Sequence, residues 1–167
     1  SIYKKNLIVQ RSNYDDIKFV DAEIDAIYQT FSDNPNIIDI VSFNSNNITE
    51  KNFKNLDIDN YNYIHIAAHG SHDINNPNYS GILLGRDDED MEDGILQSHE
   101  IFTSNLRANL VTLSSCFSGM GEIDNEEGNM GIYRSFLISG AKSVIISLWN
   151  VEDESTSILF NQFYKYL

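Results

Sequence analysis

Short apolar runs alternate with helix-like segments along this sequence, and this alternation constrains the fold more than any other feature. Runs typical of buried β-strands lie at residues 6–10, 37–43, 61–68, 109–115 and 142–149. Segments with apolar residues at helical spacing lie at residues 19–31, 130–139 and 157–167. Alternating strands and helices predict an α/β fold in three layers, with a mostly parallel central sheet and helices on both faces.

Cap and turn signals predict smaller elements between these segments. Thr49 is a suitable cap for a short helix, and Gly140 is expected to end the helix before it. The expected elements are a polar helix at 49–56, a helix at 98–106, and a hairpin whose strands at 81–85 and 94–97 flank the acidic stretch 86–93. The last helix is expected to bury Leu159, Phe160, Phe163, Tyr164 and Leu167.

Composition narrows the class of protein. The 167 residues suit one domain over 1–167, and the sequence stops inside an apparent helix, which indicates part of a longer chain. A formal net charge of −14 argues against direct nucleic-acid binding, because that binding depends on Lys and Arg. No apolar run approaches the roughly 20 residues that cross a bilayer, so no membrane partner is expected. The single cysteine is typical of a reducing compartment, so we expect a cytoplasmic protein.

Two residues with catalytic chemistry directly follow predicted strands. His69 follows the strand at 61–68, and Cys116 follows the strand at 109–115. Sites in α/β sheets lie at the carboxyl ends of strands, so neighbouring strands would bring both side chains to one rim. An imidazole can accept the proton of a thiol and later protonate a leaving amine. The backbone N–H groups of Gly70 and Cys116 could form an oxyanion hole.

Each of these residues also has a structural interpretation. A single cysteine at the end of an apolar strand is more often an inert buried thiol, and a single histidine there is more often a satisfied polar group. His65 alternates with Ile64 and Ile66, and we interpret it as structural. A zinc site from His65, His69 and His72 lacks a supporting cluster, so we expect no metal and no cofactor. The acidic stretch lacks the order of an EF-hand loop, which favours a solvated hairpin tip over a calcium site.

A resemblance to a known family rests on three blocks of sequence, "YIHIAAHGSH" at 63–72, "NLVTLSSCFSG" at 109–119 and "GIYRSFLISGAKSVIISLWNVEDEST" at 131–156. Together and in this order they resemble the motifs of the CHAT domain. That domain belongs to the caspase-like clan of cysteine peptidases, with separases, clostripain and caspases as relatives. The resemblance implies a caspase-like three-layer sandwich, a catalytic dyad of His69 and Cys116, and an oxyanion hole that includes Gly70.

The resemblance further implies a cysteine endopeptidase that cuts a protein substrate. In arginine-specific relatives, an acidic residue shortly after the W-x-V block lines the substrate pocket, and Asp153 holds the matching position here. A carboxylate there would favour a basic residue before the cut. Asp153 also suits the cap of the last helix, so both roles stay open, and Glu152 and Glu154 are the alternative candidates for the pocket. The loop after the cysteine often rearranges in caspase-like enzymes, and we expect residues 120–131 to be such a mobile loop.

CHAT domains commonly sit beside sensor modules, so we expect gating by an activating partner or an N-terminal sensor region outside this chain. The alternative is a non-catalytic CHAT-like regulatory interaction module. The presence of both His69 and Cys116 favours the enzyme over that module. An esterase is less attractive because the chain has no G-x-S-x-G elbow.

Overall fold

The computed structural model of the chain describes residues 4–10, 20–33, 37–43, 48–71, 73, 75–86, 91–114, 125–147 and 153–167. Its centre is a five-stranded sheet with the strands β1 Lys4–Gln10, β2 Ile37–Phe43, β3 Tyr63–Ala67, β7 Leu110–Leu113 and β8 Val144–Ile146. The strands stand in the order β2-β1-β3-β7-β8, and all four pairings are parallel. All five apolar runs therefore form strands, as the sequence predicted.

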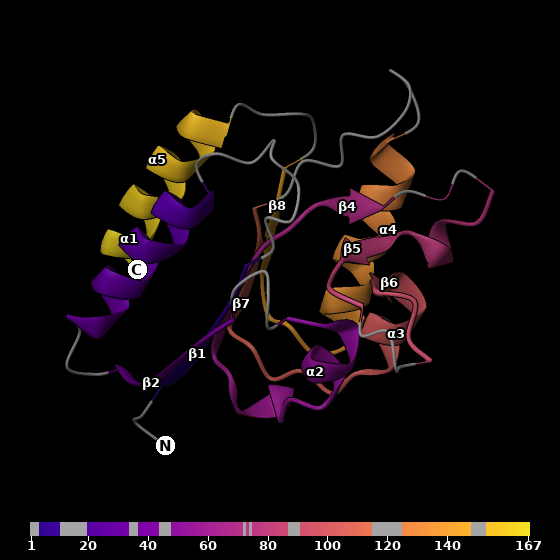
Figure 1. Cartoon of the computed structure of the whole chain (residues 1–167), viewed down its shortest axis with the longest axis horizontal. Coiled ribbons are helices and arrows are strands. Elements are labelled where there is room, and N and C mark those ends of the chain that lie inside the picture. The colour runs from indigo at the N-terminus through magenta and orange to yellow at the C-terminus, as the bar shows by residue number, and fades with distance from the viewer. Residues whose placement is uncertain are drawn as a thin grey trace.

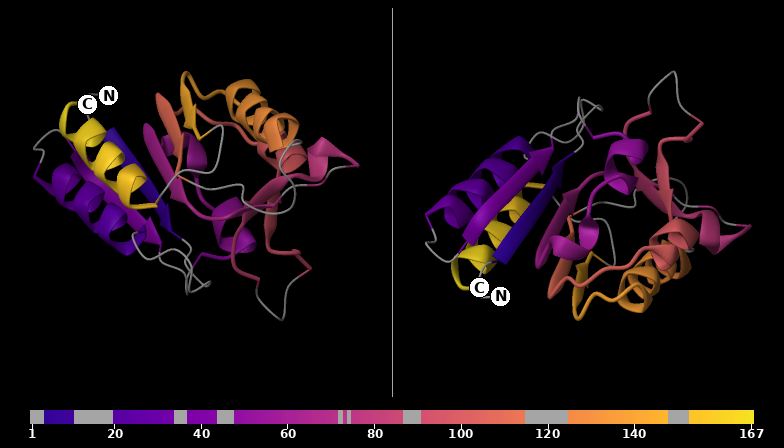
Figure 2. Two further views of the ribbon diagram at one scale, coloured as in Figure 1. Left: turned by 90° about the horizontal axis from the view of Figure 1, so that it is seen from above. Right: turned by 90° about the horizontal axis from the view of Figure 1, so that it is seen from below.

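Helices cover both faces of this sheet (Figures 1 and 2). They are α1 Val20–Ser32, α2 Glu50–Lys54, α3 Ser98–Thr103, α4 Asn125–Ile138 and α5 Asp153–Lys165. Figure 2 shows α1 and α5 side by side on one face, with α4 and α3 on the other. The α/β class, the parallel sheet and the helices on both faces are therefore confirmed.

A small antiparallel sheet lies beside α3 and α4 (Figure 1). Its strands are β4 Gly70–Ser71, β5 Gly81–Leu83 and β6 Ile95–Gln97, in the order β4-β5-β6. Two 3₁₀ helices complete the described elements, η1 Ile58–Asn60 and η2 Pro77–Tyr79. The predicted hairpin is confirmed, because β5 and β6 pair on either side of the acidic stretch.

Side chains alternate between two faces along β3, and this alternation divides the core. Ile64 and Ile66 belong to the apolar cluster beneath α3 and α4, which also contains Ile132 and Phe136. Ala67 belongs to the cluster on the opposite face of the sheet. That second cluster contains Ile24, Ile27 and Phe31 of α1, with Phe160 and Tyr164 of α5. A period of two residues is what a central strand covered on both faces requires.

Two local predictions about helix ends are confirmed. The side chain of Thr49 accepts a hydrogen bond from the N–H of Asn52 at 3.1 Å and so caps α2. Gly140 follows α4 with φ of +117°, in the left-handed region that glycine tolerates best. A Cβ atom at Gly140 would lie 2.1 Å from the carbonyl oxygen of Leu106, so a larger residue does not fit there.

The start of α4 differs from the prediction. This helix begins at Asn125, five residues before the predicted start at Met130. Residues 125–131 are therefore helical, and the prediction of a mobile loop over 120–131 is wrong for that part; residues 120–124 lie outside the described residues. The sequence 125–129 contains no apolar residue, so hydrophobic periodicity gives no signal there.

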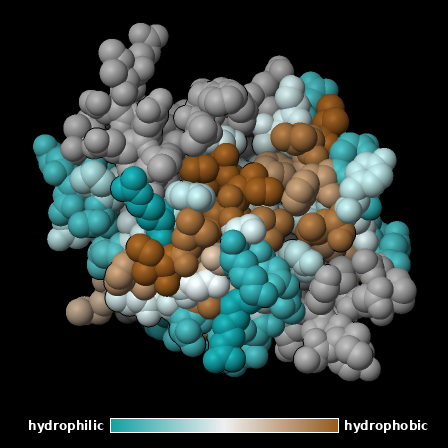
Figure 3. All heavy atoms as spheres, turned by 180° about the vertical axis from the view of Figure 1, so that it is seen from behind, coloured by the Kyte–Doolittle hydropathy of each residue, from teal (hydrophilic) through white to brown (hydrophobic). Residues whose placement is uncertain are grey.

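The prediction for α5 is partly wrong. Phe160 and Tyr164 are buried and Phe163 is partly buried, but Leu159 is 63% exposed and Leu167 is 53% exposed. Only the side of the helix that faces α1 and the sheet is covered, so the apolar residues beside it stay in solvent. Figure 3 shows apolar side chains gathered on the face seen from behind. No described helix combines the length and the apolar character that crossing a membrane demands.

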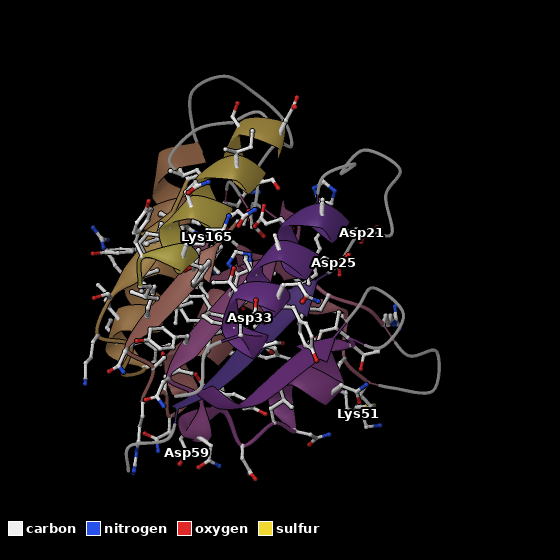
Figure 4. All side chains as sticks on the ribbon, turned by 90° about the vertical axis from the view of Figure 1, so that its left-hand side faces the viewer. Asp21, Asp25, Asp33, Lys51, Asp59 and Lys165 are labelled. Atoms are coloured by element: carbon white, nitrogen blue, oxygen red, sulfur yellow. The ribbon has the colours of Figure 1, made fainter. Side chains whose placement is uncertain are left out.

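The outer side of α1 carries much of the negative charge of this layer. Asp21 and Asp25 are exposed, as is Asp33 directly after the helix. Figure 4 shows these three residues along α1 and Lys165 at the end of α5. The first turn of α1 contains Asp21 and Glu23, and acidic residues there favour the helix because its N-terminus carries a partial positive charge.

Candidate active site

The site was predicted at the carboxyl ends of β3 and β7. These two strands are neighbours, and Ile66 pairs with Leu113. The N–H of Ser114 donates to the carbonyl of Ile66 at 2.9 Å, so the pairing continues one residue beyond β7. The chains that leave β3 and β7 therefore start side by side.

His69 lies two residues beyond the end of β3 and is half-buried. Its carbonyl accepts a hydrogen bond from the N–H of Leu83 at 2.8 Å, which fixes its backbone to β5. Gly70 follows as the first residue of β4 and stands opposite Ile82. The small sheet thus holds the backbone of both predicted site residues at the rim of the large sheet.

Of the remaining predicted site residues, Asp153 begins a described helix and the others lie outside the described residues. Cys116 and His72 lie outside the described residues, so the distance between His69 and Cys116 is not given by the structure. Asp153 is the first residue of α5, at the helix start that the sequence predicted. The described residues therefore include the backbone of His69 and Gly70, and the roles of both residues stay predictions.

His65 is structural, as the sequence analysis interpreted it. Its side chain is 1% exposed on the α1 and α5 face of the sheet. Its Nε2 atom lies 2.8 Å from Oε1 of Glu23, and its Nδ1 atom lies 3.2 Å from the hydroxyl of Tyr164. That hydroxyl donates to Oγ1 of Thr112 at 2.8 Å. Both ring nitrogens of His65 are engaged, so it is not available for a zinc site with His69 and His72.

A second polar cluster joins α2, α3 and the hairpin. The ammonium group of Lys54 lies 2.5 Å from Glu50, 2.7 Å from Glu92 and 2.6 Å from Glu100. Glu50 also accepts the N–H of Gly94 at 2.7 Å. The three carboxylates are close enough to hold a metal ion, but the Lys54 ammonium already hydrogen-bonds each of them. This cluster is therefore an ion-pair network.

The environment shifts the ionisation of this cluster. Burial raises the pKa of the Glu50 carboxyl above its usual value, although hydrogen bonds from Lys54 and Gly94 act in the opposite direction. Burial alone would lower the pKa of Lys54, but the hydrogen bonds to Glu100, Glu50 and Glu92 outweigh it and raise that pKa. Lys54 therefore holds its proton more firmly in the folded protein than in the unfolded chain.

Neither polar network was predictable from the sequence. Glu23 and His65 are separated by 42 positions, and no local pattern connects them. Lys54 is 38 positions from Glu92 and 46 from Glu100, and only its partner Glu50 stands at the i,i+4 spacing that sequence can reveal. Ion pairs of this kind form between segments that only the fold brings together, so a local sequence pattern does not reveal them.

No curated protein matches the chain. Among solved structures, a flavodoxin of Streptococcus pneumonia TIGR4 is similar to this chain with 14% identity and a TM-score of 0.49, over 96% of this chain and 95% of that one. A likeness at that level carries no argument about function. The family model described as CHAT domain matches residues 4–167, which is almost the whole sequence. The chain therefore belongs to the CHAT domain family, which is related to the caspase-like cysteine peptidases.

Proposed function

We propose that this chain is a cysteine endopeptidase with Cys116 as the nucleophile and His69 as the acid and base, on a caspase-like version of the α/β fold. The observation that carries the proposal is the adjacency of β3 and β7 as parallel strands. His69 follows β3 by two residues, and Cys116 follows β7 by three residues. Membership of a family related to cysteine peptidases supports the same chemistry.

The spacing of the two residues supports the pairing. Paired residues of β3 and β7 differ by 47 in number, as His65 and Thr112 do. His69 and Cys116 differ by the same number. A histidine and a cysteine placed by this register would meet at the rim where α/β sheets hold their sites.

The backbone of Gly70 supports the oxyanion hole. Leu83 donates its N–H to the carbonyl of His69, so Gly70 and Ile82 form the pair of residues that exchange no hydrogen bonds with each other. In such a pair the N–H points away from the neighbouring strand, so the Gly70 N–H is directed away from β5. With the N–H of Cys116 it would stabilise the negative oxygen of a tetrahedral intermediate.

The reaction then follows from these roles. His69 accepts the proton of the Cys116 thiol, and the thiolate attacks the carbonyl carbon of the scissile peptide bond. The tetrahedral intermediate collapses, His69 gives its proton to the leaving amine, and a thioester remains on Cys116. His69 next accepts a proton from water, whose hydroxide attacks the thioester and releases the acid and the thiol. Thiolate chemistry suits a reducing compartment, so a cytoplasmic location belongs to this proposal. Gating of the activity by a partner or sensor module is a separate part of the proposal.

The dyad is tested with an irreversible, thiol-directed peptide probe that carries Arg, applied to the full-length protein and read by mass spectrometry. We expect labelling at Cys116, none in Cys116→Ala, and at least about tenfold slower labelling in His69→Ala, because the thiolate loses its base. His99→Ala is the matched control, since His99 lies on α3, and it should label at the normal rate. Equal labelling of wild type and His69→Ala would show that His69 does not activate the thiol. No labelling of the wild type, with its partners present, would support the regulatory interaction module instead.

We further propose that Asp153 lines the substrate pocket and favours Arg or Lys before the cut. Asp153 starts α5 directly after the segment that leaves β8, and β8 is the parallel neighbour of β7. A carboxylate at this position would form charged hydrogen bonds with a basic side chain. We expect Asp153→Asn to lower kcat/KM for Arg substrates by about tenfold and to leave apolar substrates unchanged. Asp25→Asn, an exposed change on α1, is the control, and Glu154→Gln tests the alternative carboxylate. An unchanged substrate ranking in Asp153→Asn would leave Asp153 with a structural role only.

A further inference from the structure

A pocket of about 320 Å³ lies between α2, α3 and the end of α4. Ile58 and Leu106 in its wall stand shortly before β3 and β7. The pocket therefore lies near the N-terminal ends of these strands, whereas His69 lies beyond the carboxyl end of β3. Its apolar wall consists of Phe53, Ile58, Leu96, Ile101, Leu106 and Phe136. A volume of this size is in the range of small-molecule sites, whose walls are mostly apolar.

The polar part of the pocket has a definite chemical character. It is formed by Lys54, Glu100, Thr103 and Ser104. The Thr103 hydroxyl donates to the Glu100 carbonyl at 2.9 Å, and the Ser104 hydroxyl donates to the Ile101 carbonyl at 2.6 Å. The Lys54 ammonium has three N–H groups, and three carboxylates surround it. The donors of this wall are therefore already engaged within the protein.

Acceptors and negative charge remain in surplus. Glu50, Glu92 and Glu100 share one ammonium, so the ionised cluster carries two net negative charges. A carboxylate can accept about four hydrogen bonds. Glu100 has two described partners, Lys54 on Oε1 and the N–H of Gln97 on Oε2. Its side chain is only 22% exposed, so solvent weakens its field less than on an open surface.

We propose that this pocket binds a small hydrophobic amine, with its apolar body against Phe53, Ile101 and Phe136 and its protonated nitrogen beside Glu100. The hydrocarbon of the ligand gains from leaving water for the apolar pocket, and the surplus carboxylate charge attracts the cation. An anionic ligand of the same shape meets repulsion. A neutral one gains the apolar contact without the ion pair.

The test uses three probes with the same phenylethyl body, namely phenethylamine, 2-phenylethanol and 3-phenylpropionate. Each is titrated into the ¹⁵N-labelled protein at neutral pH, and the shifts of the backbone amides of Leu96, Ile101 and Phe136 are followed by NMR. We expect saturable shifts with phenethylamine, about tenfold weaker binding of 2-phenylethanol, and no saturable shift with 3-phenylpropionate.

Two variants locate the charge effect. Thr103 is exposed at the pocket and lies outside the ion-pair network, so Thr103→Lys adds a cation while every member of that network is kept. We expect it to weaken phenethylamine about tenfold and to leave 2-phenylethanol within about twofold. Glu100→Gln should weaken phenethylamine severalfold, because it removes one charge and keeps an acceptor oxygen. Glu154→Gln removes an exposed charge on α5, across the sheet, and should change nothing.

The outcomes separate clearly. Selective binding of the amine that Thr103→Lys abolishes supports the proposal, even if Glu100→Gln proves unstable. Equal affinity for the three probes would overturn the preference for a cation. Absence of saturable shifts at the pocket residues with every probe would overturn the pocket as a ligand site. Amine binding that is insensitive to Thr103→Lys would place the site elsewhere and would equally overturn the proposal.

Discussion

At the scale of single residues, the contact between His65 and Glu23 joins two polar side chains that are both removed from water. Both side chains are almost fully buried, at 1% and 3% exposure, between β3 and α1. A buried hydrogen-bonding group is tolerated because it has a partner, and the loss of one partner leaves the other without compensation for its lost hydration. The stability of the fold should therefore depend on the oxygen of Glu23 more than on the size of its side chain.

We expect Glu23→Ala to lower the free energy of unfolding by about 2–3 kcal/mol, because the Nε2 atom of His65 loses its acceptor. Glu23→Gln keeps an oxygen of similar reach and should cost about 1 kcal/mol or less. Asp25→Ala, an exposed change on the same helix, should stay within about 0.5 kcal/mol of wild type. Urea denaturation measures all three, and equal losses in Glu23→Gln and Glu23→Ala would contradict the role of the acceptor.

At the scale of elements, Lys54 connects three segments that are far apart in the chain. It stands on α2 and contacts Glu92 beside the hairpin and Glu100 on α3. Its pKa is raised in the folded state by these carboxylates despite its burial. A raised pKa means that the folded protein binds this proton more tightly than the unfolded chain, so the contribution to stability is complete below the unfolded pKa and is lost as pH rises through the folded pKa.

We therefore expect the free energy of unfolding to fall as pH is raised above about 10.5, the ordinary pKa of lysine. The buried hydroxyl of Tyr164 acts in the same direction, since burial raises its pKa as well. Lys54→Arg keeps the positive charge at alkaline pH and should make the decline shallower, and Tyr164→Phe should remove the second part. Urea titrations at several alkaline pH values give the slopes, and an unchanged slope in Lys54→Arg would show that this ion-pair network does not control the decline.

At the scale of the whole molecule, the excess of acidic residues opposes compaction. The formal net charge is −14, and the outer side of α1 is acidic. Repulsion between exposed charges is screened by salt, whereas the partly buried network around Lys54 is screened less. We expect Tm to rise by about 2–4 °C between low and moderately high NaCl concentration, a shift of ~1 kcal/mol for a chain of this size. Circular dichroism measures it, and a fall in Tm would show that ion pairs outweigh the net repulsion.

The sequence predicted the central architecture well because strand signals are local. The runs that became β1, β2, β3, β7 and β8 are short, apolar and separated by turn signals, so their existence and their alternation with helices could be read directly. The edge of the sheet that carries His69 followed from the general rule for parallel sheets. The roles of His69, Gly70, Cys116 and Asp153 all stay predictions, and the experiments above test the dyad and Asp153.

The rest depended on contacts between distant segments. The first turn of α4 is polar and glycine-containing, so its helical state was not visible as a hydrophobic period. Leu159 was expected to be buried because the sequence shows which residues are apolar, whereas the extent of cover on α5 is set by α1 and the sheet. Glu23, the carboxylate partner of His65, lies 42 positions away from it, and Glu92 and Glu100 lie 38 and 46 positions from Lys54. No signal within one segment reveals such pairs.

The strand order β2-β1-β3-β7-β8 has a consequence for how the chain can be assembled during synthesis. After β1, each further strand of the large sheet joins one of its free edges, first β2 on one side and then β3, β7 and β8 successively on the other. Among the described strands, none has to insert between two strands that are already paired. The ribosome delivers the N-terminal part first, so the sheet can grow strand by strand while translation continues. The slow pairing of segments that are distant in the sequence is then divided into a series of shorter steps. The last step among the described elements needs β8 and α5.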